Sequence, residues 1–158
     1  MESLHFIDDH ALQIEAPLES VWRALLRTAR ASFAITLPKP ILKVWGLEET
    51  RQTGTWDASV AVGDTLPGFH VEACAPGTLL ALGGRHRFAR YELRFELVPT
   101  AGGNVTLHAK TFAVFPGWAG RLYRALVIGT GGHRIVVSRM LRKVARRASR
   151  EASRAPAP

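Results

Sequence analysis

The sequence has little of what would mark a secreted or membrane-spanning protein. It contains a single cysteine, Cys74, so no intramolecular disulfide can form and we expect a reducing compartment. No apolar run approaches the roughly 18 residues that a membrane-spanning helix needs. The first ten residues, Met1 to His10, have no basic start and no apolar stretch, so we expect no signal peptide. These features together predict a cytoplasmic protein.

Motifs for metal, phosphate and catalysis are also missing. The six histidines form no His-x-x-x-His pair and have no cysteine at metal-binding spacing, so we expect no metal ion and no other cofactor. The glycine-rich segment 129–132 lacks the strand-turn-helix setting of a phosphate loop. Sequence patterns therefore assign no catalytic residue.

What is present is the composition of one globular domain. The chain has 158 residues, of which 47% are hydrophobic and 22% charged, enough for a core that needs no disulfide or metal. We expect a single domain over residues 1–149. Residues 150–158 are rich in Arg, Ala and Pro and are expected to form a disordered tail.

Positive charge is concentrated toward the C-terminus. The net charge is +8, and the residues after His133 include eight of the 21 basic residues but one of the 13 acidic residues. The nearly neutral remainder argues against a nucleic-acid-binding body. Five clustered basic side chains have two interpretations: a solvated helix face whose charge suits the C-terminal helix dipole, or attraction to an anionic membrane or partner. They are Arg139, Arg142, Lys143, Arg146 and Arg147.

Hydrophobic periodicity predicts mainly strands between a first and a last helix. Patterns typical of strands occupy residues 4–15, 41–47, 69–74, 79–82, 89–97 and 105–115. Helical patterns occupy about residues 17–29, 31–37 and 118–148. We expect Gly83–Gly84 to end one strand and Pro99–Asn104 to form a hairpin connection. Strands joined by short turns pair antiparallel.

The predicted fold follows from which faces are apolar. In the strand Ala89–Leu97, apolar and charged residues alternate, so one face is dry. The last helix also has one apolar stripe, and the two surfaces are expected to pack together. This gives an α+β domain with a curved antiparallel sheet of six to seven strands wrapped round a long C-terminal helix, with one or two short helices after the first strand.

Four segments resemble the SRPBCC superfamily of helix-grip proteins, which includes START lipid-transfer domains, birch-pollen-type allergens and polyketide cyclases. They are the segment Ile14–Trp22 at the first helix entry, Val62–Asp64, Gly84–Pro99 and Phe115–Arg124. The resemblance is greatest to small bacterial members. It implies a hydrophobic cavity between the sheet and the long helix. It implies no universal catalytic residue.

Residues on the apolar faces of the strands and the last helix are candidates for lining that cavity. They are Tyr91, Phe95, Thr111, Leu126, Thr130 and His133. His133 is interpreted either as a core histidine or as a polar anchor for a ligand. The nearby glycines Gly129, Gly131 and Gly132 have three interpretations: they kink the helix, let it approach the sheet closely, or leave room for a ligand.

An acid-base pair is a further possibility in the first strand. One strand register places Asp8 and His10 on the same face as Leu12 and Ile14, where they would face the cavity. The alternative is a solvated strand end.

We therefore expect binding or transport of an apolar small molecule, such as a lipid, an isoprenoid or an aromatic polyketide. One alternative is an enzyme similar to polyketide cyclases and dehydratases. Another is an accessory protein that contacts a membrane or partner through its basic helix. Several convergent polar groups with perturbed protonation would favour the enzyme, whereas an apolar lining would favour the carrier.

Overall fold

The computed structural model describes residues 3–34 and 51–154. These residues form six strands, three α-helices and one turn of 3-10 helix. In chain order they are β1 (His5–Ile14), α1 (Leu18–Phe33), β2 (Thr65–Leu66), β3 (Phe69–Ala75), β4 (Leu79–His86), β5 (Ala89–Pro99), η1 (Ala101–Gly103), β6 (Val105–Val114), α3 (Gly117–Val127) and α4 (Gly132–Arg154).

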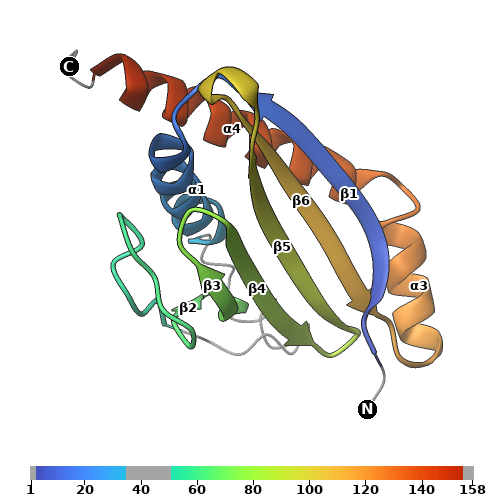
Figure 1. The fold of residues 1–158 in the computed structure, drawn as a ribbon. Coiled ribbons are helices and arrows are strands. Elements are labelled where there is room, and N and C mark those ends of the chain that lie inside the picture. The colour runs from blue at the N-terminus through green and yellow to red at the C-terminus, as the bar shows by residue number, and fades with distance from the viewer. Residues whose placement is uncertain (1–2, 35–50, 155–158) are drawn as a thin grey trace.

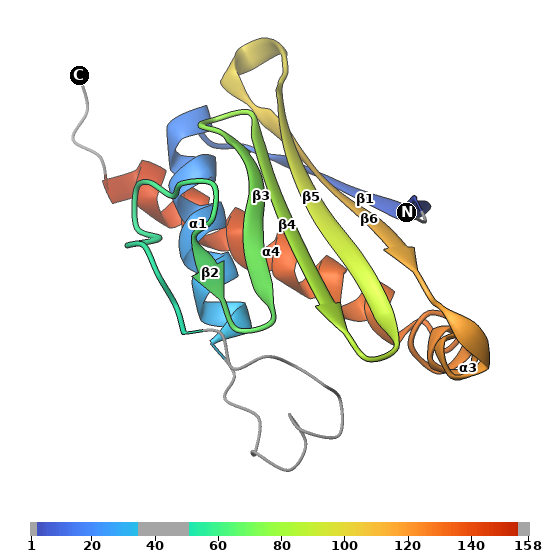
Figure 2. The same cartoon turned by 90° about the horizontal axis from the view of Figure 1, so that it is seen from below.

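All six strands belong to one antiparallel sheet in the order β1-β6-β5-β4-β3-β2. β1 therefore leaves its sequence neighbours and pairs with β6, as Figure 1 shows. α4 runs across one face of this curved sheet, with α1 beside it (Figure 2). The predicted α+β architecture is confirmed.

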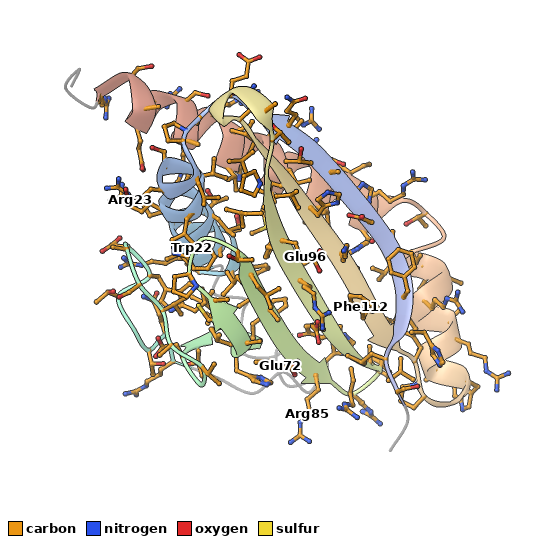
Figure 3. The ribbon with its side chains drawn as sticks, viewed as in Figure 1. Trp22, Arg23, Glu72, Arg85, Glu96 and Phe112 are labelled. Atoms are coloured by element: carbon orange, nitrogen blue, oxygen red, sulfur yellow. The ribbon has the colours of Figure 1, made fainter. Side chains whose placement is uncertain are left out.

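The two faces of the sheet differ because polar and apolar residues alternate along β5. Leu93, Phe95 and Leu97 are buried on the face that the helices cover. Arg94 and Glu96 lie at the alternate positions, on the opposite face, which Figure 3 views with Glu96 and Phe112 labelled. This face carries ion pairs such as Lys110–Glu96 and Arg94–Glu92.

α1 begins directly after Pro17, where a proline costs no helix hydrogen bond. Its apolar stripe is buried as the spacing predicts, with Val21, Leu25 and Ala29 fully inaccessible. α1 packs against α4, and together they cover the half of the sheet that holds the main core.

The prediction of a single C-terminal helix over residues 118–148 is wrong. The structure has two helices, α3 and α4, separated by residues 128–131. Gly131 has a positive φ of 75°, which an L-residue adopts only with strain, and its N–H donates to the carbonyl of Ile128 in a tight turn. The glycines therefore break the helix, and α4 alone is the long helix that crosses the sheet.

Two further boundaries also differ from the prediction. β4 does not end at Gly83–Gly84 but continues to His86, because both glycines pair with β5. α4 continues to Arg154, so residues 150–154 are helical rather than part of a frayed tail. The predicted strand 41–47, the end of the predicted helix 31–37 and residues 155–158 lie outside the described residues.

Trp56 is a core residue that no periodic pattern indicated. It is fully buried with a positive φ of 55°, and its indole N–H donates to the carbonyl of Thr53 at 2.7 Å. Trp56 therefore packs into one side of the core from a loop.

We predict that Phe95→Ala lowers the free energy of unfolding by about 3–5 kcal/mol, because the ring is fully buried and its removal leaves a cavity. Urea denaturation measures the change. Val98→Ala is the control, since this side chain on the same strand is 46% exposed and its loss should change stability by less than about 0.5 kcal/mol. A similar small effect for Phe95→Ala would contradict its placement in the core.

Candidate ligand cavity

A cavity of about 710 Å³ lies between the sheet and the helices, at the end of the sheet away from the main core. Its walls come from the end of α1, from β3 to β6, from α3 and from the first half of α4. The exposed lining residues Val136, Arg139 and Lys143 lie where the cavity meets solvent. The break between α3 and α4 lets both helices line it.

Aromatic side chains from five elements form a continuous part of the wall. Phe33 of α1 packs on Phe69 of β3 with ring centroids 4.3 Å apart, and Phe69 meets Tyr91 edge-on at 5.2 Å. His86 then lies 5.6 Å from Tyr91 and 4.8 Å from Tyr123 of α3. Such a chain of rings suits a flat, apolar ligand.

Tyr91 contributes its ring rather than its hydroxyl. The hydroxyl donates to the carbonyl of Gly68 at 2.8 Å. Burial, with a smaller contribution from Tyr123, raises the pKa of Tyr91 from 10.0 to about 12. The ring lies directly over Gly84, where an added Cβ would come within 2.5 Å of it. Gly84 therefore has a packing role in the cavity wall.

His86 and Tyr123 are also held in their neutral forms. Burial lowers the pKa of His86 and raises the pKa of Tyr123. In both cases the cause is the removal of the charged form from water. This part of the wall is aromatic and uncharged at neutral pH.

A cluster of polar side chains in mutual contact lies at one corner of the cavity, where β1 and β6 meet the start of α4. Thr111 Oγ1 and His133 Nε2 are hydrogen-bonded at 2.9 Å. Asp8 Oδ1 lies 3.5 Å from the same nitrogen, and Asp8 Oδ2 lies 3.2 Å from His10 Nε2. The side chains of Asp8, His10 and His133 are all less than 20% exposed. Asp8, His10, Thr111 and His133 are named the polar corner below.

A bulge in β1 brings the carboxylate to this corner. Phe6 pairs with Phe112 and Asp8 with Thr111, so Ile7 is passed over in the ladder. Asp8 and His10 consequently share the covered face with Leu12 and Ile14. The observed register therefore turns Asp8 and His10 toward the interior. The alternative interpretation, in which both residues lie in a solvated strand end, is wrong.

The polar corner can orient a polar group of a ligand. Asp8 Oδ1 is buried, makes no hydrogen bond within the described residues and lies 3.5 Å from His133 Nε2. Both contacts of His133 use Nε2. Nδ1 has no hydrogen-bond partner among residues 3–34 and 51–154, and it is the ring atom left for a ligand.

The predicted cavity residues separate into two groups. Tyr91, Thr111 and His133 lie together in the wall. Phe95 lies instead in the core, fully buried, while Leu126 is 60% exposed on the outer side of α3. Thr130 is exposed in the turn after α3, and its hydroxyl bonds the carbonyl of Leu126. The prediction for Leu126 and Thr130 depends on one continuous helix, whereas that for Phe95 depends on its position on the apolar face of β5.

The five basic residues lie on α4, where Arg139, Arg142, Lys143 and Arg146 are exposed and Arg147 is half-buried. None of them forms an ion pair with a carboxylate in the described part of the chain. Arg139 and Lys143 also border the cavity.

Sequence patterns missed His86 and Tyr123. His86 follows a Gly-Gly pair that was read as a strand end, and Tyr123 sits beside rather than on the apolar stripe of α3. Aromatic residues are frequent near the β4–β5 turn and in α3, and this feature of the sequence could have indicated an aromatic part of the cavity wall.

The described residues contain no cluster of three or more His, Cys, Asp or Glu side chains placed to hold a metal ion. Over residues 3–34 and 51–154, no helix has the length and apolar character needed to span a bilayer.

Comparison with known proteins rests on structure. No family model and no curated protein matches the chain. The Zhui aromatase/cyclase from Streptomyces sp. R1128 is 13% identical with a TM-score of 0.54, covering 96% of this chain and 95% of its own. Norcoclaurine synthase from Thalictrum flavum, solved with dopamine and hydroxybenzaldehyde, is 16% identical with a TM-score of 0.53, over 90% and 86%. A conserved protein from Geobacillus kaustophilus is 14% identical with a TM-score of 0.53, over 90% and 94%.

These similarities cover nearly the whole chain at low identity, and they show the fold. The chain has the helix-grip fold, an antiparallel sheet crossed by a long C-terminal helix, as the resemblance of its sequence segments implied.

The two tyrosines of the chain allow a direct test of the wall. We predict that Tyr91 ionises near pH 12 in the folded protein, and that Tyr91→Phe removes this late step from the ultraviolet titration of tyrosinate. The folded state favours the protonated phenol. The stability that the raised pKa of Tyr91 contributes is therefore complete below pH 10.0 and is lost as pH rises toward 12. A titration of Tyr91 at its ordinary pKa would contradict its burial.

Proposed function

We propose that the chain binds an apolar, ring-containing small molecule in the cavity and holds one polar group of that molecule at the polar corner. The observation that carries this proposal is the division of the cavity wall. Aromatic and aliphatic side chains line most of it, while Thr111 and His133 offer hydrogen-bonding groups at one end.

The size of the cavity supports a ligand of several rings. Ligand sites commonly enclose about 300–1,000 Å³, and a volume near 710 Å³ lies within that range. The structural neighbours add support, because one was solved with dopamine and hydroxybenzaldehyde and another is an aromatase/cyclase. An aromatic polyketide or a similar fused-ring compound fits this site better than a flexible acyl chain.

Binding is favoured over catalysis by what causes the pKa shifts. Burial is the main cause of the shifts at His86, Tyr91 and Tyr123, and in each case it keeps the group neutral. The hydroxyl of Tyr91 is already used by a backbone carbonyl. A reaction would need groups poised to exchange protons, and this part of the wall has instead the chemistry of a container.

A cyclase- or dehydratase-like enzyme is the second candidate, and the buried Asp8–His133 contact favours it. A carboxylate 3.5 Å from an imidazole nitrogen can orient the ring, as a general base requires. Native mass spectrometry of the purified protein separates the two candidates. A co-purified compound that stays chemically unchanged on incubation supports a carrier, whereas conversion that stops in His133→Gln supports the enzyme.

We predict that naphthol binds more tightly than naphthalene and that Thr111→Val removes this difference. The substitution keeps the shape of the side chain and deletes the hydroxyl that positions His133. The lost advantage should be about fivefold to tenfold in Kd, equal to one hydrogen bond of roughly 1 kcal/mol. Fluorescence titration with the two compounds measures it.

The matched control is Thr106→Val, which removes a half-buried hydroxyl from the opposite face of β6. It should leave both affinities unchanged. If wild type binds neither compound, the proposed cavity function fails. If naphthol keeps its advantage in Thr111→Val, the polar corner is not the anchor.

A further inference from the structure

We propose that the outer face of α3 docks on the surface of an anionic lipid bilayer. α3 stands at the end of the molecule away from α1 (Figures 1 and 2). It carries the largest group of exposed apolar side chains among the described residues. The proposal concerns the outside of this helix and does not depend on what the cavity holds.

The exposed apolar residues of α3 form one face. Trp118, Leu122 and Leu126 are spaced four residues apart, so they follow one side of the helix. Their exposed fractions are 79%, 56% and 60%. Ile135 and Val136, in the first turn of α4, add exposed fractions of 52% and 65% close to the same corner of the chain. A group of large, exposed apolar side chains indicates an interaction surface, whereas exposed apolar residues that occur singly do not.

The fold does not need this face for its own stability. α3 attaches to the domain through its other side, where Gly120 is buried and Tyr123 and Val127 line the cavity. A Cβ on Gly120 would come within 2.7 Å of the Phe115 backbone and 3.0 Å of the Phe88 carbonyl. The helix thus sits close against the sheet end by one face and presents Trp118, Leu122 and Leu126 outward.

The charge around this face selects a lipid surface as the partner. Between Glu96 and Glu151 the sequence has no acidic residue, and α3 itself carries the exposed bases Arg121 and Arg124. α4 adds the exposed bases described above. A second copy of the chain would bring two positive surfaces together, whereas an anionic bilayer offers negative charge and an apolar interior. An amphipathic helix with Trp and Leu on one face and Arg beside them suits that boundary.

Docking in this way would place lipid beside the cavity. Val127 and Ile128 line the cavity at the end of α3, and exposed Val136 lines it at the start of α4. The helix that borders the cavity on one side therefore contacts the bilayer on the other. An apolar ligand could then pass between membrane and cavity over a short apolar path.

The test is co-sedimentation of the full chain with vesicles of equal parts phosphatidylglycerol and phosphatidylcholine, compared with phosphatidylcholine alone. Wild type should bind the anionic vesicles and bind neutral ones weakly. Trp118→Ala/Leu122→Ala/Leu126→Ala should bind at least about tenfold less tightly, because the inserted apolar area is lost. Alanine keeps helix propensity, so circular dichroism should be unchanged. Val62→Ala/Val98→Ala, at exposed apolar sites elsewhere, should bind as wild type does.

A second set of variants tests the charge. Exchanging both Arg121 and Arg124 for Gln should weaken binding severalfold for each charge removed. Exchanging Arg139, Arg142, Lys143, Arg146 and Arg147 for Gln should abolish binding at physiological salt, where the screening length is about 8 Å.

Three outcomes overturn the proposal. In the first, wild type does not bind anionic vesicles even at low salt. In the second, the α3 alanine variant binds as wild type does. In the third, analytical ultracentrifugation without lipid finds a wild-type dimer that the alanine variant converts to a monomer, which makes the face an interface between copies. Naphthol binding by the alanine variant, measured alongside, should be unchanged, so failure here is distinct from failure of the cavity function.

Discussion

The structure depends on one packing constraint: the apolar face of β5 and β6 is longer than α1, one of the two helices that cover it. α1 and α4 pack together over one half of this face and exclude water there, around Phe95, Leu97 and Leu107. Toward the other end α1 has ended, and the sheet faces α4 across an open space. The same strands thus make a solid core at one end and a cavity at the other. Changing the length of α1 would move the boundary between the two.

The strand pattern made much of this arrangement predictable. The alternation in β5, the hairpin to β6 and the stripe of α1 each depend on local periodicity, and all three were as expected. The apolar stripe of the last helix and the apolar face of the sheet predicted that this helix packs across the strands. Pairing of β1 with β6 joins segments about a hundred residues apart, and no periodicity within either strand specifies it.

The site was less predictable, for reasons that particular residues explain. The prediction for Thr130 and Leu126 extends one helical stripe through three glycines. The turn at Gly131 ends that stripe, so these two residues lie away from the cavity while Tyr123 and Val127 line it. Trp56 fills the core from a loop in which neither helix nor strand period exists. His86 and Tyr123 meet only because the β4–β5 turn and α3 come to the same end of the sheet.

The bulge at Ile7 decides which side chain lies beside the cavity residue His133. Were the ladder continued evenly from the pairing of Phe6 with Phe112, Ile7 would stand opposite Thr111 and Asp8 opposite Lys110 on the other face. Because the ladder skips Ile7, the carboxylate of Asp8 stands opposite Thr111 in place of an aliphatic side chain. A one-residue insertion or deletion in this edge strand would thus exchange the carboxylate beside His133 for an aliphatic side chain, with Thr111 and His133 left in the cavity wall. Relatives of this chain can therefore diverge in ligand preference through strand length alone, a change that substitution-by-substitution comparison of their pockets would miss.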